Sequence, residues 1–217
     1  MCQKVSDVRR LNGRSRLADT AVAECPHTTV VALVCSAGGL DAIRHILTRL
    51  PAGFPAAVIV LRHHTPDSHD RLAAILSRSV ALPVATARDG DALLAGHVLV
   101  APAGYHTLVT ADGRVALIES GDRPPYRPSA DLLLSTLATA AGPRAVAVVL
   151  SGHGNDGATG ATAIHRFGGI VIASDAATST VFAMPHATIS REETVDHVVP
   201  LDQIPALLAA LVGVGRR

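Results

Sequence analysis

The most informative stretch of the chain is Val30-Val-Ala-Leu-Val-Cys-Ser-Ala-Gly-Gly-Leu40. Its apolar first half favours a buried strand, and the polar Ser36 and a glycine pair come before a predicted helix over residues 41–50. In open α/β folds such a junction lies at the carboxyl edge of a parallel sheet, where sites are built. The helix start adds N–H groups that favour an anion. Ser36 is therefore a candidate nucleophile, although a tight turn or a phosphate-binding loop also fits this pattern.

The composition limits the class of protein. The 217 residues suffice for one domain with a full core, and 48% of them are apolar although only 2% are aromatic. A core of small aliphatic side chains suits helices layered on a parallel sheet. The net charge of +1 and the few aromatic residues argue against a nucleic-acid partner. No apolar run is long enough for membrane insertion, and the three cysteines indicate no disulfide framework, so we expect a cytoplasmic protein.

The rest of the chain alternates between strands and helices. Apolar runs predict strands at 56–61, 97–101, 145–150 and 169–173, and helices are predicted at 68–78, 129–141, 158–166 and 205–212, the last after a loop that carries Pro185. An Asp-Gly turn within 107–118 predicts a β-hairpin. The predicted fold is α/β: a three-layer, doubly wound, mostly parallel sheet with this hairpin. Residues 1–28 are expected to form a flexible leader, and 29–217 the α/β domain.

Polar residues follow several of the buried strands. Ser36 comes after the first strand, His63 and His64 after the second, and Asp156 lies in a glycine-rich loop after the strand at 145–150. Loops that follow parallel strands share one edge of the sheet, so these side chains can meet. Nucleophilic hydrolysis needs a hydroxyl, an imidazole that takes its proton and a carboxylate that orients the imidazole. The three loops supply one of each, in an order that differs from that of α/β-hydrolases.

Each of these residues also has a simpler explanation. His63 and His64 could bind a metal with Asp67 and His69, although their spacing matches no standard zinc pattern. Asp156 could cap the helix that begins near Ala158, alone or in addition to a catalytic role. Cys35 could compete as a nucleophile. Neighbours on a strand face opposite sides, so if Ser36 faces the site, Cys35 is a small buried residue.

The chain from about Val30 to Val212 resembles the catalytic domain of the chemotaxis protein-glutamate methylesterases, the CheB type. The matching segments follow one another in family order: Cys35-Ser-Ala-Gly-Gly39, Arg62-His-His-Thr-Pro66, Ala101-Pro-Ala-Gly-Tyr-His106, Arg127-Pro-Ser-Ala-Asp131, Leu150-Ser-Gly-His-Gly-Asn-Asp-Gly-Ala158 and Phe182-Ala-Met-Pro185. The resemblance implies a serine hydrolase that removes methyl groups from glutamyl γ-methyl esters of chemoreceptor-type signalling proteins. It leaves open whether glutamine is deamidated as well.

The resemblance also implies roles for individual residues. Its catalytic residues fall on Ser36, His64 (two before Pro66, and therefore preferred to His63) and Asp156. The backbone N–H groups of Gly38 and His153 are expected to bind the oxyanion. Substrate contacts are expected from Ala37, Arg127 and Met184. The reaction needs no cofactor and no metal.

The chain departs from the family pattern at several positions. Ala37 replaces the usual Ser or Thr, and His153 stands where the family usually has Met. Only about 28 residues precede the esterase segment, whereas the family usually carries a phosphorylatable receiver domain there. Control by phosphorylation would then need a separate receiver protein as a partner, beside the methylated substrate.

Other functions compete with hydrolysis. The main alternative is a catalytically reduced binding module in a signalling complex, for which the changes at Ala37 and His153 leave room. A caspase-like enzyme would need Cys where the chain has Ser174. A phosphate-binding protein would be expected to carry a Gly-Lys-Ser/Thr loop or a full dinucleotide fingerprint, and the sequence has neither.

Overall fold

The structure is a computed structural model that describes residues 28–63, 71–121, 127–191 and 193–213. Of the predicted leader over residues 1–28, only Thr28 is described. The elements in chain order are β1 (Thr29–Cys35), α1 (Gly39–Leu47), β2 (Ala56–Arg62), α2 (Leu72–Leu76), β3 (Val84–Thr86), β4 (Val98–Val100), β5 (Tyr105–Val109), β6 (Val115–Glu119), α3 (Ala130–Ala141), a 3₁₀ turn (Gly142–Arg144), β7 (Ala145–Val149), α4 (Ala158–Arg166), β8 (Ile170–Ser174), α5 (Ala183–Ile189), β9 (His197–Val199) and α6 (Ile204–Gly213).

The predicted parallel sheet is confirmed. Seven strands pair in the order β3-β4-β2-β1-β7-β8-β9, and every pair is parallel. β1 and β2 are in the centre, and each is an almost uninterrupted apolar run because both faces of a central parallel strand are covered. The hairpin predicted near 107–118 is the antiparallel pair β5-β6, a separate two-stranded sheet.

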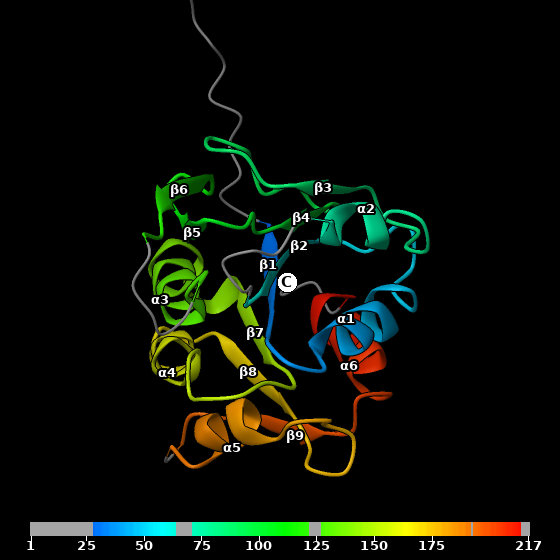
Figure 1. The fold of residues 1–217 in the computed structure, drawn as a ribbon, viewed down its shortest axis with the longest axis vertical. Coiled ribbons are helices and arrows are strands. Elements are labelled where there is room, and N and C mark those ends of the chain that lie inside the picture. The colour runs from blue at the N-terminus through cyan, green and yellow to red at the C-terminus, as the bar shows by residue number, and fades with distance from the viewer. Residues whose placement is uncertain (1–27, 64–70, 122–126, 192, 214–217) are drawn as a thin grey trace, which may run out of the picture.

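Helices cover both faces of the large sheet, which gives the predicted three layers (Figure 1). One core lies between the sheet and α3, α4, α5 and the hairpin, and it takes Val30, Ala32 and Val34 from β1. The other core lies between the sheet and α1, α2 and α6, and it takes Val31, Leu33 and Cys35 from the same strand. The side of each strand residue therefore alternates, and this alternation decides which polar residues at the strand ends can meet.

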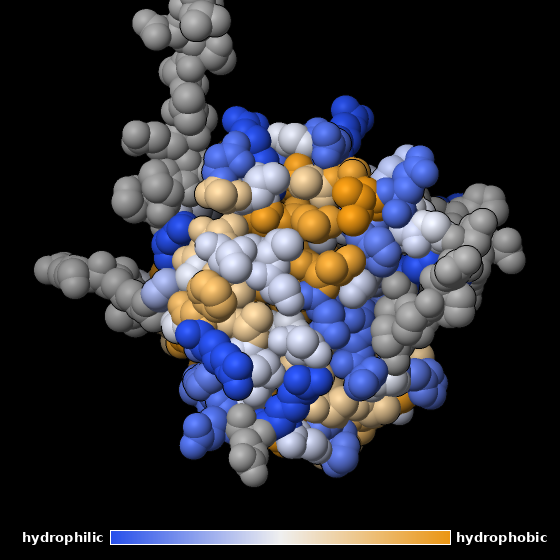
Figure 2. All heavy atoms as spheres, turned by 90° about the vertical axis from the view of Figure 1, so that its left-hand side faces the viewer, coloured by the Kyte–Doolittle hydropathy of each residue, from blue (hydrophilic) through white to orange (hydrophobic). Residues whose placement is uncertain are grey.

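Apolar side chains gather on the outer surface of the hairpin and α3 (Figure 2). The large apolar residues most exposed there are Ile118 of β6, with 49% of its surface accessible, Tyr105 of β5 and Leu132 of α3. No helix in the described part of the chain is long and apolar enough to span a bilayer.

The structure differs from the predicted elements in several places. α1 begins at Gly39, two residues before the predicted start. The predicted helix over 68–78 is the short α2, and its residues 68–70 lie outside the described part of the chain. The loop predicted around Pro185 is wrong, because this proline lies in the first turn of α5. The first-turn N–H groups of a helix have no partner within the helix, so proline is tolerated there. The three-residue strand β9 is too short to show a period in sequence.

Candidate active site

Ser36 follows the last residue of β1 at the carboxyl edge of the sheet, as predicted. The Ser36 backbone N–H donates to Ser151 O at 2.9 Å, which continues the pairing of β1 with β7 beyond the ends of both strands. Gly38 has a φ of 75° and precedes α1, so the chain turns sharply just after Ser36. This φ lies in the left-handed region that glycine adopts without strain. Ser36 is half-buried at this turn.

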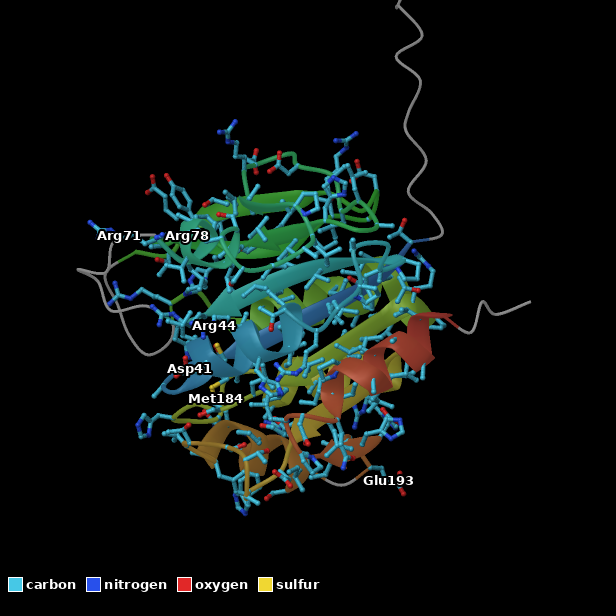
Figure 3. All side chains as sticks on the ribbon, turned by 90° about the vertical axis from the view of Figure 1, so that its right-hand side faces the viewer. Asp41, Arg44, Arg71, Arg78, Met184 and Glu193 are labelled. Carbon is cyan, nitrogen blue, oxygen red and sulfur yellow. The ribbon has the colours of Figure 1, made fainter. Side chains whose placement is uncertain are left out.

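The space around Ser36 is filled by Gly152 and Met184. A Cβ atom added to Gly152 would lie 2.7 Å from Ser36 Cβ and would overlap Met184 Sδ, so no side chain fits at this glycine. Met184 is fully buried, and its N–H donates to Gly152 O at 2.9 Å. Figure 3 labels Met184, which lies on α5. Met184 therefore packs beside Ser36 and Gly152, and its contact with substrate stays a prediction.

Asp156 forms the centre of a hydrogen-bonded cluster. It is 2% exposed, and its Oδ2 atom lies 2.8 Å from His63 Nε2. Its carboxylate also accepts three hydrogen bonds from the start of α3: from Ala130 N at 2.6 Å, from Asp131 N at 2.9 Å and from Ser129 Oγ at 3.1 Å. Burial alone would raise the pKa of Asp156, but the hydrogen bonds from His63 and from the two backbone N–H groups outweigh it and hold this pKa below its ordinary value. Asp156 is therefore a carboxylate at neutral pH.

The helix that Asp156 caps is not the one expected. The sequence allowed it to cap the helix that begins near Ala158, but Gly157 is the N-cap residue of α4 and no side chain of its own caps that helix. The Asp156 side chain reaches the start of α3 instead. It therefore combines a capping role with the contact to His63, but for a helix that is distant in sequence.

The histidine that meets Asp156 is His63, whereas the sequence analysis selected His64. His64 lies outside the described residues. Within β2, Leu61 faces the core that contains α3 and α4, and Arg62 pairs in register with Cys35. By the alternation of strand residues, His63 faces the same side as Leu61, the side on which Asp156 lies. The register of β2 against β1, which sets this parity, is a property of the folded sheet.

Cys35 has the inert position that the sequence suggested. It is fully buried against α1, in the core opposite to α3. A Cβ atom added to Gly39 would overlap Cys35 Sγ, so the thiol is enclosed by the first turn of α1. Burial raises the pKa of Cys35 to about 12, even though the charge of Arg62 lowers it. The residue therefore carries no thiolate at neutral pH.

The candidate oxyanion groups lie on the two loops that flank Ser36. Gly38 is at the N-terminal end of α1, where N–H groups point out of the helix. His153 is exposed in the loop that follows β7. Within the described residues, neither of these N–H groups donates to a backbone carbonyl. Both are consistent with oxyanion binding, and their role stays a prediction.

The remaining predicted contacts are only partly placed. Ala37 is half-exposed, and its carbonyl accepts a hydrogen bond from Ser151 Oγ at 2.7 Å. Arg127 precedes α3, and its guanidinium donates to Gly121 O at 2.7 Å. Their contacts with substrate stay predictions.

Several residues that support the site were not predicted. Ser151 Oγ accepts from Val181 N at 3.0 Å and donates to Ala37 O, so it joins the loop after Ser36 to the loop before α5. His106 Nδ1 accepts from Ser129 N at 3.0 Å, beside the hydroxyl that reaches Asp156. Burial lowers the pKa of His106 although the charge of Asp156 raises it, which keeps the ring neutral and able to accept. Both residues lie in the segments that carry the family resemblance, but nothing in those segments shows their partners.

The metal alternative finds no support among the described residues. Across 28–63, 71–121, 127–191 and 193–213, no three His, Cys, Asp or Glu side chains gather in a way that could hold an ion. His64, Asp67 and His69 of that alternative lie outside these ranges.

Comparison with known proteins gives the same family as the sequence motifs. The family model "CheB methylesterase" matches residues 31–208. The "Protein-glutamate methylesterase/protein-glutamine glutaminase" of Moorella thermoacetica is 40% identical over 195 residues, which cover 88% of this chain and 46% of that protein. The "Protein-glutamate methylesterase/protein-glutamine glutaminase 2" of Pseudomonas aeruginosa is 36% identical over 226 residues, which cover 99% of this chain and 64% of that protein. The chain thus spans about half of the length of the curated relatives it matches.

A solved structure agrees with the fold. The Thermotoga maritima CheB methylesterase catalytic domain superposes with a TM-score of 0.81 at 34% identity, covering 86% of this chain and all of that one. Because the family model spans most of the chain and the structural match spans an entire catalytic domain, this protein belongs to the CheB methylesterase family.

Proposed function

We propose that this chain is a serine hydrolase that removes methyl groups from glutamyl γ-methyl esters, with Ser36, His63 and Asp156 as its catalytic residues. The observation that carries the proposal is the 2.8 Å contact between His63 Nε2 and Asp156 Oδ2, at the edge of the sheet where Ser36 follows β1. His63 takes the place of His64 in the predicted triad because of this contact. The names of the relatives, protein-glutamate methylesterases, support the choice of reaction.

In the proposed reaction each ring nitrogen of His63 has its own role. Asp156 holds Nε2, so Nδ1 is the nitrogen that takes the proton of Ser36 Oγ. Ser36 Oγ then forms a bond with the ester carbonyl carbon, and the carbonyl oxygen becomes an anion. The backbone N–H groups of Gly38 and His153 stabilise this anion by donating to it. The carboxylate of Asp156 stabilises the imidazolium and keeps the ring oriented.

The remaining steps return the enzyme to its starting state. His63 gives its proton to the methoxy oxygen, the carbon–oxygen bond to that group breaks, and methanol leaves. Water then gives a proton to His63 while its oxygen forms a bond with the acyl carbon. The bond between that carbon and Ser36 Oγ breaks, His63 gives its proton to Ser36 Oγ, and the glutamate side chain leaves. A glutamine side chain enters the same sequence with ammonia as the leaving group, in keeping with the glutaminase part of the relatives' name.

The substrate and the location follow from the same proposal. The substrate is a methylated chemoreceptor-like protein that the enzyme meets in the cytoplasm. These points rest on the family and on the names of its members, and not on a contact in the structure.

Two adjacent histidines make a sharp test of the catalytic assignment. Methanol release from a methylated receptor fragment is measured for the wild type, Ser36→Ala, His63→Gln and His64→Gln. Loss of the nucleophile or of the base should lower kcat by about 10⁴-fold or more, since triad residues act as a unit. His64→Gln is the matched control and should retain most of the activity. A near-normal rate for Ser36→Ala would exclude the proposal, and an inactive His64→Gln beside an active His63→Gln would return the base to His64.

A further inference from the structure

Two carboxylates cap the N-terminal ends of α3 and α4 reciprocally, each from a residue at the start of the other helix. Asp156, just before α4, accepts from the N–H groups of Ala130 and Asp131 in the first turn of α3. Asp131, in that first turn, accepts through Oδ1 from Gly157 N at 2.9 Å and from Gly160 N at 2.8 Å in α4. Each helix therefore receives its capping carboxylate from the other.

Asp131 contacts both the side chain of Asp156 and the backbone of the residue that follows it. Its backbone N–H donates to Asp156 Oδ1 at 2.9 Å, and its side chain binds the N–H of Gly157, the next residue along the chain. No side chain at the N-cap of α4 can do this, because that residue is glycine. The Asp131 carboxylate is the group that supplies the missing cap.

Close packing of the two helices leaves little freedom in this arrangement. A Cβ atom added to Gly160 would lie 2.5 Å from Leu134 Cβ and 3.0 Å from Asp131 O. The glycine therefore lets α4 approach α3 at the level of Asp131. Burial and the nearby charge of Asp156 raise the pKa of Asp131, while the N–H groups of α4 oppose this effect. The fold thus keeps a second carboxyl group close to the first, at some electrostatic cost.

We propose that Asp131 is a positioning residue for the reaction: it fixes Gly157 and thereby Asp156, and through the His63–Asp156 hydrogen bond it fixes the imidazole. The inference rests on the proposed function, because it gives His63 and Asp156 the roles of base and orienting carboxylate. A displacement of about 1 Å at a catalytic group can cost on the order of 100-fold in rate. Loss of Asp131 should therefore act on kcat and leave KM nearly unchanged.

The test compares Asp131→Ala and Asp131→Asn with Asp196→Ala as a matched control. Asp196 also accepts a backbone hydrogen bond, from Val171 N at 2.7 Å, but at the start of β8, away from the carboxyl edge. For each variant we would measure kcat and KM for methanol release, the rate of Ser36 labelling by a fluorophosphonate, the melting temperature, and the downfield proton resonance of the His63–Asp156 hydrogen bond.

We expect Asp131→Ala to lower kcat and the labelling rate by about 10- to 100-fold, with KM within about twofold of the wild type. Asp131→Asn keeps an oxygen acceptor, so it should recover part of the loss and fall about 3- to 10-fold below the wild type. The downfield resonance should shift or broaden in both variants. Asp196→Ala should lower the melting temperature and leave the other readouts unchanged.

Two results would overturn the inference. One is an Asp131→Ala enzyme with the kcat, labelling rate and proton resonance of the wild type. If Asp131→Ala does not fold, Asp131→Asn decides the question, and wild-type values of all three quantities in that variant contradict the expected 3- to 10-fold loss. The other is an equal loss of kcat per active site in Asp131→Ala and Asp196→Ala. If the wild type labels at Ser36 but releases no methanol, the proposed substrate is wrong, and the labelling rates still test the role of Asp131.

Discussion

Replacing Asp156 should damage both stability and catalysis, whereas replacing Ser36 should damage catalysis alone. In Asp156→Ala the N–H groups of Ala130 and Asp131 lose their acceptor at the start of α3, and the hydrogen bonds from Ser129 and His63 are lost as well. Ser36→Ala keeps the backbone bond from Ser36 N to Ser151 O. The two variants therefore separate the structural and chemical roles of the proposed triad.

The magnitude follows from the buried donors. Each buried donor left without a partner costs about 1–3 kcal/mol. Ala130 N is buried and Asp131 N is partly buried, so the two backbone N–H groups together cost about 2–6 kcal/mol. This exceeds the loss of an ordinary helix cap, about 0.5–2 kcal/mol. We expect Asp156→Ala to lower the free energy of unfolding by about 3–4 kcal/mol at neutral pH. Asp156→Asn should lower it less, since the amide oxygen can still accept.

Urea unfolding followed by circular dichroism gives the comparison. The midpoint of Asp156→Ala should fall with an unchanged m value, because the same surface is exposed on unfolding. Ser36→Ala should unfold within about 0.5 kcal/mol of the wild type. A loss under about 1 kcal/mol in Asp156→Ala would refute the reasoning, because it would mean that these hydrogen bonds do not hold the start of α3.

Three further outcomes are expected. Gly152→Ala should lower kcat at least tenfold, because the new methyl group would overlap Met184 Sδ and press on Ser36 Cβ; steady-state methanol release gives this value, and an unchanged kcat would contradict the packing. Native protein should not react with Ellman's reagent at Cys35, whose buried thiol has a pKa of about 12, whereas urea-unfolded protein should; fast labelling of the folded protein would contradict its burial. The pKa of Asp156 is lowered on folding, so its contribution to stability should be complete above its unfolded pKa of about 3.9 and lost as the pH falls through the lower folded value. In urea titrations from pH 6 to pH 2, the free energy of unfolding should therefore fall less in Asp156→Asn than in the wild type.

Most of the fold could be predicted because the sheet is built from apolar runs. Central strands such as β1 and β7 are covered on both faces and contain almost only aliphatic residues, so their positions are plain in sequence. Short elements were harder. β9 has three residues, and α5 contains a proline that suggested a loop, although a first-turn proline is compatible with a helix.

The sequence predicts which edge of the sheet carries the candidate site, but not which side chains contact one another there. The order of strands and loops brings Ser36 and Asp156 to the same edge, and that follows from parallel topology alone. The choice between His63 and His64 depends on a register of one residue, which reverses the face of a side chain. The hydrogen bond by which Asp156 caps α3 connects residues 26 positions apart, and no local sequence pattern predicts such a contact.

The reciprocal capping of α3 and α4 by Asp156 and Asp131 affects which residues a family member can lose together with its activity. A descendant that served only as a binding module could lose Ser36 or His63 at little cost to folding, yet selection for a stable fold would still retain Asp156. An intact aspartate is then weak evidence that a relative is an active enzyme. Under the proposed mechanism, Ser36 and His63 are the residues whose loss would mark an inactive descendant.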